Sequence, residues 1–134
     1  MALRIEIREG ETPLTVRDAT QLDEALGRAA EEARKQGMLG AVLIEAENGK
    51  VLTMVVGGDE TVLGFDDYDG QNLRCYASRG ASDADEPMVT CYLTMHHHTE
   101  FPRKNVISQS DGVKAVRQFL DSGALPTCIN WEEV

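Results

Sequence analysis

The sequence predicts an α+β fold in which an antiparallel β-meander sheet carries one N-terminal and one C-terminal helix packed on one face. Short β-rich runs follow one another between Ala41 and Met95, with tight turns between them. Such turns favour antiparallel pairing because a parallel pair needs a long crossover connection. Segments with apolar residues at helical spacing lie before and after these runs. At 134 residues the chain can form a single core, so we expect one domain over residues 1–134.

The N-terminal part is expected to form a strand and then a helix. Leu3 to Arg8 alternates apolar and charged residues, which is typical of a strand with one solvent-exposed face. Thr20 is the expected N-cap of the helix, because Asp23 follows three residues later as in a weak capping box. Apolar residues, mostly alanines, recur from Leu22 at helical spacing, and Gly37 ends the helix.

The central part is expected to form the meander. Asn48-Gly49, a strong hairpin signal, joins two β-rich runs, Ala41 to Glu47 and Val51 to Val56. The further expected strands are Thr61 to Phe65, Asn72 to Tyr76 and Met88 to Met95. In the last strand, alternation places Val89, Cys91, Leu93 and Met95 on one face.

The C-terminal part is expected to form a helix, a turn and a strand. The helix buries an apolar stripe that includes Phe119, and Gly123 ends it through a left-handed turn. Pro126 prevents the helix from resuming, so the residues after it are extended. Trp131, the only tryptophan, is expected to be buried with Phe119 as a structural anchor. Cys128 is expected to point into the fold.

A run of three histidines, His96-His97-His98, is the first candidate for chemistry. If the preceding strand continues, His96 and His98 point outward and His97 inward, so at most two can converge on one ion. Zinc needs about three or four protein ligands. We therefore expect a solvated strand end and no metal. The alternative is a small metal-dependent enzyme or metal-binding module that uses His96 and His98.

Two acidic segments are the candidate binding sites. Asp66-Asp67-Tyr68-Asp69-Gly70 is expected to be a hairpin tip. It resembles the start of a calcium loop, but strands flank it where an EF-hand would need two helices. Three carboxylates around Tyr68 would provide an anchor and a rim for a basic pocket. The second segment supplies Asp83, Asp85 and Glu86, and a solvated loop is the simpler interpretation there because it has no aromatic anchor.

Charge and composition narrow the function classes. The chain has 23 acidic and 13 basic residues, for a net charge of −10, which repels nucleic acid and raises the association rate of a basic protein. Charge that serves only solubility is the alternative interpretation. The sequence begins without a signal-peptide pattern, and no apolar run approaches the roughly 20 residues that span a bilayer. We expect a soluble, cytoplasmic protein with no membrane partner.

Motifs for catalysis are not found in the sequence. It lacks a phosphate-binding glycine loop, a Gly-x-Ser-x-Gly elbow and the zinc-deaminase signature. Cys75, Cys91 and Cys128 are an odd number at wide spacing, which fits buried reduced thiols better than disulfides or a metal knuckle. We therefore expect no enzyme activity, no cofactor and no resident metal.

The C-terminal third carries a resemblance to a known family. Phe101-Pro102-Arg103, Ile107-Ser108, the following helix, Ser122 to Pro126 and Trp131 resemble the C-terminal half of the first-numbered immunity-protein family of bacterial polymorphic toxin systems. The resemblance implies a small α+β protein that binds a cognate toxin domain in the same cell and occludes its active site. Toxins that deaminate nucleic-acid bases are associated with this family, and a nuclease is the other expected toxin. A general acidic adaptor is a further alternative.

Overall fold

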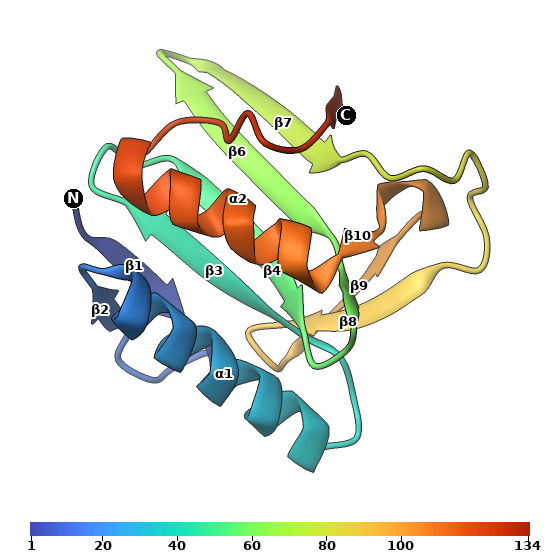
Figure 1. The fold of residues 1–134 in the computed structure, drawn as a ribbon, viewed down its shortest axis with the longest axis horizontal. Helices are drawn as coiled ribbons and strands as arrows, with labels where there is room; N and C mark the ends of the chain where they lie inside the picture. The colour runs from blue at the N-terminus through green and yellow to red at the C-terminus, as the bar shows by residue number, and fades with distance from the viewer.

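The computed structural model describes the backbone of residues 1–134 and every side chain except that of Asp69. Figure 1 shows two helices lying across one face of a large sheet. The elements in chain order are β1 (Leu3–Glu6), β2 (Leu14–Val16), α1 (Ala19–Lys35), β3 (Gly40–Ala46), β4 (Val51–Val56), β5 (Glu60–Thr61), β6 (Leu63–Asp69), β7 (Asn72–Ser78), β8 (Val89–Leu93), β9 (His97–Phe101), the 3-10 helix η1 (Arg103–Asn105), β10 (Ile107–Ser108), α2 (Gln109–Ser122) and β11 (Trp131–Glu133).

The main sheet is largely antiparallel, as the sequence predicts. Its strands lie in the order β11-β7-β6-β4-β3-β1-β2, and every neighbouring pair on this path is antiparallel. One pair departs from the predicted meander, because β8 runs parallel to β3, with Tyr92 opposite Gly40. The β8–β9 hairpin therefore leaves the main path, and β5 and β10 form a separate small sheet.

Helix α1 differs from the prediction in two ways: a second strand precedes it, and it begins two residues earlier in the sequence. It follows two strands, whereas the sequence predicted only one. Strand β2 was missed because its three residues are too few to show a periodic pattern. Its N-cap is Asp18 and not Thr20: the Asp18 carboxylate accepts a 2.8 Å hydrogen bond from the backbone N–H of Gln21. Asp18 has extended backbone angles, whereas Thr20 already lies inside the helix.

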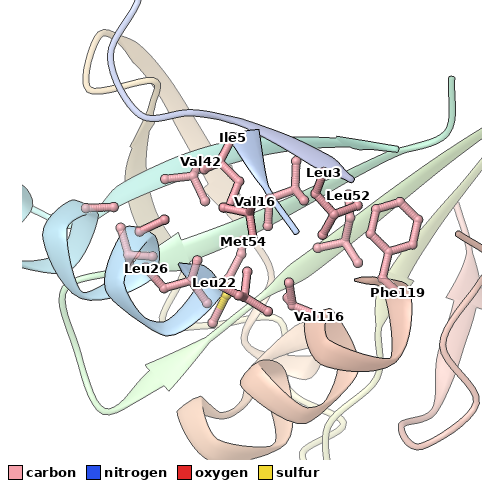
Figure 2. Packing of buried hydrophobic residues seen from close by; sticks show 14 of the residues in the cluster. Leu3, Ile5, Val16, Leu22, Leu26, Val42, Leu52, Met54, Val116 and Phe119 are labelled. Atoms are coloured by element: carbon pink, nitrogen blue, oxygen red, sulfur yellow. The ribbon is translucent and has the colours of Figure 1, made fainter. Parts of the chain in front are cut away.

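The core lies between the sheet and the two helices. Figure 2 shows Leu22 and Leu26 of α1 and Val116 and Phe119 of α2 packed against the strand residues. The predicted burial of Phe119 is confirmed, since its exposed fraction is 0%. Its ring meets Phe65 of β6 edge to face, with 5.8 Å between ring centroids. Each such buried side chain contributes about 1.5–3 kcal/mol through the hydrophobic effect.

A smaller core lies on the opposite face of the sheet, under the β8–β9 hairpin. Cys91 is fully buried there, and Val89 and Leu93 pack against the same cluster, which confirms that these residues share a face. The strand ends at Leu93, however, because Thr94 and Met95 have positive φ angles of 50° and 61° and turn the chain back. The prediction that the strand continues through Met95 toward the histidines is therefore wrong.

The C-terminal helix–turn–strand prediction is confirmed, with two corrections. Gly123 ends α2 in the left-handed conformation, and β11 pairs with β7. Trp131 is only partly buried, with its indole N–H donating to the Pro126 carbonyl oxygen at 2.7 Å. Cys128 is exposed, because the loop before Trp131 crosses the surface, where Gln118 accepts a hydrogen bond from the Cys128 backbone N–H.

Candidate functional site

The β6–β7 hairpin carries the first acidic segment. Strand β6 continues to Asp69, which pairs with Asn72, so only Gly70 and Gln71 form the turn. Asp66 to Gly70 lie at the end of a hairpin, as expected, but Asp66 to Asp69 are strand residues and not turn residues, because four residue pairs keep them in the sheet. In Figure 1 the tip of this hairpin projects beyond α2 at the top of the view.

Strand alternation divides the acidic segment between two faces. Phe65 is buried under the helices, so Asp67, two residues later, lies on the helix face. Asp66 and Tyr68 lie on the opposite face, which we call the open face. The predicted ring of three carboxylates around Tyr68 is therefore not formed. The side chain of Asp69 lies outside the described residues.

Asp67 is not available as an isolated negative charge. Its carboxylate lies 3.6 Å from the ammonium nitrogen of Lys50, which follows the β3–β4 turn. Arg74 lies directly opposite Asp67 in the register of the hairpin. The helix face of the hairpin therefore combines Asp67 with basic neighbours. The other acidic residue whose face is known, Asp66, lies on the open face.

The open face of the hairpin presents apolar side chains to solvent. Tyr68 and Leu73 are cross-strand partners with exposed fractions of 65% and 48%. Val134 is 72% exposed, and its backbone N–H donates to the Cys75 carbonyl oxygen at 2.9 Å, which places it beside β7. We call Asp66, Tyr68, Leu73, Cys75 and Val134 the hairpin patch. Exposed apolar groups on one face make the hairpin patch a candidate interaction surface.

An acidic group lies among these apolar side chains. Asp66 pairs with Cys75 across the two strands. Burial, followed by a hydrogen bond to Asp66 and the negative charge of its carboxylate, raises the pKa of the Cys75 thiol, so the thiol stays protonated at neutral pH. The hairpin patch thus combines an exposed phenol, aliphatic groups and one carboxylate.

The second acidic segment is tied to the rest of the molecule. Arg79 donates to the Asp83 carboxylate at 2.6 Å and to the carbonyl oxygen of Ser82 at 2.5 Å. The backbone N–H of Arg103 donates to the Asp85 carbonyl oxygen at 2.9 Å. Asp83, Asp85 and Glu86 are all exposed, as a solvated loop requires, but the charge of Asp83 is paired.

Glu132 is the centre of a polar network that the sequence did not reveal. It accepts a 2.8 Å hydrogen bond from Asn105 and lies near Lys104 and Arg79, at 3.6 and 3.8 Å. The hydrogen bond from Asn105, and then the charges of Lys104 and Arg79, hold the pKa of Glu132 below its usual value. These contacts join β7, β11 and η1 and fix the base of the long loop before β8.

The three histidines do not alternate as predicted, because His96 and His97 face the same carboxylate and their ring centroids are 4.8 Å apart. His96 and His97 lie 3.8 and 3.2 Å from the Glu9 carboxylate, whereas His98 lies 3.7 Å from Glu100. His96 and His98 therefore face different carboxylates. Within the described side chains, no group of three or more histidine, cysteine or acidic residues is arranged to hold a metal ion.

The cysteines occupy three different environments. Cys91 is buried, and burial raises the pKa of its thiol from 9.0 to about 11. Cys75 is partly buried and Cys128 is exposed, so the prediction of three buried thiols is right only for Cys91.

Sequence reasoning missed Leu73 and Val134, although both belong to the patch. Counting outward from a two-residue turn at Gly70-Gln71 would have placed Leu73 opposite Tyr68. Val134 had no local signal, because its position depends on pairing between β11 and a strand more than fifty residues earlier.

The arrangement defines a mixed α/β protein whose most exposed apolar surface lies on a projecting hairpin. The family model of immunity protein Imm1 matches residues 10–133, and the chain belongs to this family. Imm1 is an immunity-protein family of polymorphic toxin systems, so the protein has a toxin as its binding partner and a neutralising role. No curated protein matches the sequence. No helix in the described chain is long and apolar enough to cross a membrane.

Proposed function

We propose that this protein binds the catalytic domain of a cognate toxin through the hairpin patch and occludes the toxin's active site. The observation that supports this most is the exposed cross-strand pair of Tyr68 and Leu73 on a projecting hairpin. Tyrosine is enriched among the residues that dominate interface energies, and an exposed tyrosine beside a leucine provides a central anchor.

The proposed toxin acts on nucleic acid, as a deaminase or a nuclease. Such an enzyme needs a basic cleft to hold a phosphate backbone. A protein with a net charge of −10 is attracted to that cleft, and Asp66 offers a carboxylate beside the Tyr68 anchor. Asp83, Asp85 and Glu86 form a secondary candidate contact. Occlusion needs a rigid complementary surface and neither a nucleophile nor a cofactor, so we propose a binding role without catalysis.

Co-expression with a cognate toxin domain tests the binding surface. We expect Tyr68→Ala to abolish protection of the cells and Tyr68→Phe to retain most of it, because the phenyl ring keeps the buried area. Asp66→Asn should slow association with the toxin, whereas Asp121→Asn, at an exposed helix end, is the matched control for lost charge. Full protection by Tyr68→Ala would place the interface elsewhere.

A competition experiment tests occlusion separately from binding. A labelled oligonucleotide bound to a catalytically inactive toxin should be displaced by the wild-type protein, because both occupy one cleft. Fluorescence anisotropy measures the displacement. A stable complex of toxin, oligonucleotide and this protein would show that inhibition, if present, does not act by covering the cleft.

A further inference from the structure

A cleft with a volume of about 390 Å³ lies between β5, β8 and η1. Its apolar lining includes Leu39, Met88, Val89 and Val106. Met88 is 39% exposed, which makes it one of the few large apolar side chains that this protein leaves in solvent. The volume lies within the range of about 300–1,000 Å³ in which proteins bind small groups.

The two acidic residues at the rim of the cleft differ in whether they form an ion pair. Glu60 accepts two hydrogen bonds from Arg103, at 3.0 and 2.9 Å, so these charges compensate each other. Asp59 is exposed and forms no ion pair in the described part of the chain. Its backbone is held in place, because its carbonyl oxygen accepts a 3.0 Å hydrogen bond from the backbone N–H of Gln109. The cleft therefore carries one uncompensated negative charge at an apolar opening.

This combination selects one kind of occupant. An anion would be repelled by Asp59, and a purely apolar group would leave the charge of Asp59 uncompensated beside it. A lysine or arginine side chain fits both features, because its long stem is apolar and its end is cationic. Methionine is well suited to such a stem, since its flexible thioether adapts to different shapes.

We propose that this cleft receives a basic side chain of the toxin, with the stem against Leu39 and Met88 and the cationic end at Asp59. The identity of the partner rests on the proposed function, but the chemistry of the cleft does not. The site is separate from the hairpin patch: the two share no residue. It would give the complex a second contact whose energy depends on both charge and apolar area.

A titration without toxin tests the cleft alone. Butylguanidinium chloride is added to the isotopically labelled protein, and backbone amide chemical shifts are followed by NMR, with sodium chloride at equal ionic strength as the reference. We expect saturable shifts in the millimolar range at Leu39, Asp59 and Met88. Asp59→Asn should remove the saturation, and Asp121→Asn should leave it unchanged. Shifts that do not saturate, or that persist in Asp59→Asn, overturn the proposal.

Affinity for the toxin tests the same cleft in the complex. We expect Asp59→Asn and Met88→Ala each to weaken binding about tenfold, a loss typical of the minority of interface residues that contribute measurably to affinity. Met88→Leu should restore most of the affinity because it keeps the apolar area, and thermal melting confirms that each variant is folded. If wild-type protein binds the toxin but both variants bind equally well, the cleft proposal fails while the proposed function stands. If the wild type binds no toxin, the proposed function fails, and the NMR titration alone decides the chemistry of the cleft.

Discussion

Phe119 and Trp131 occupy neighbouring places in the core but differ in burial. Phe119 is fully buried, whereas Trp131 is partly exposed. The ring centroids of Trp131 and Phe65 are 6.2 Å apart. We expect Phe119→Ala to cost about 3–5 kcal/mol of unfolding free energy, and Trp131→Ala to cost less because part of its surface already meets water. Trp131→Phe, which removes the hydrogen bond to Pro126 but keeps an aromatic ring, should cost about 1 kcal/mol. Urea unfolding measures all three, and an equal loss in both alanine variants would contradict the difference in burial.

The lowered pKa of Glu132 predicts how its contribution to stability changes with pH. A carboxylate with a lower pKa in the folded state stabilises the fold above its unfolded-state pKa, and this stability is lost as the pH falls through the folded value. Glu132→Gln should therefore be less stable than the wild type at about pH 7, and the difference should shrink as the pH falls below about 4. Unfolding free energies measured over this range check the sign. A difference that is independent of pH would show that the network does not depend on the charge of Glu132.

At the scale of elements, two glycines test how tightly segments approach one another. A Cβ atom on Gly80 would lie 2.0 Å from the carbonyl oxygen of Val106, whereas one on Gly27, in α1, would meet nothing within 4 Å. We expect Gly80→Ala to destabilise the protein strongly because two backbone segments must move apart. Gly27→Ala should stabilise it by up to about 1 kcal/mol, since alanine is the better helix former. Melting temperatures that shift in the same direction would contradict this placement.

Elements with local signals were predictable, and those that depend on distant pairing were not. The Asn48-Gly49 hairpin and the Gly123 helix end follow from their own residues, and the structure confirms both. The parallel pairing of β8 with β3 has no local pattern, because it joins segments about fifty residues apart. The turn at Thr94 and Met95 could not be predicted from the sequence either, since neither residue favours a positive φ angle.

The candidate site shows the same division. The sequence indicated Asp66 and Tyr68 as candidate contact residues, because a tyrosine among carboxylates is easily seen there; the structure shows Tyr68 exposed and Asp66 partly buried. The division of the segment between two faces, and the addition of Leu73 to the patch, required the register of the hairpin. Asp59 and Met88 were not predicted as site residues, because the cleft that both line forms only when β5 and β8 come together.

At the scale of the whole molecule, the net charge of −10 should control how fast the toxin associates. We expect the association rate constant to fall steeply as sodium chloride rises from about 0.01 to 0.5 M, because the Debye length shrinks from about 30 Å to only a few ångströms. The dissociation rate constant should change much less, since it depends on packed groups such as Tyr68. Stopped-flow kinetics separates the two, and an association rate independent of salt would contradict electrostatic steering.

The central claim is that a toxin binds on the open face of the β6–β7 hairpin. Amide hydrogen exchange of this protein, alone and with the toxin domain, tests that claim most directly. We expect binding to slow exchange at residues 66–75, around the pair of Tyr68 and Leu73, with smaller protection near Asp59 and Met88. Protection confined to other elements, with unchanged exchange throughout the hairpin, would contradict the claim.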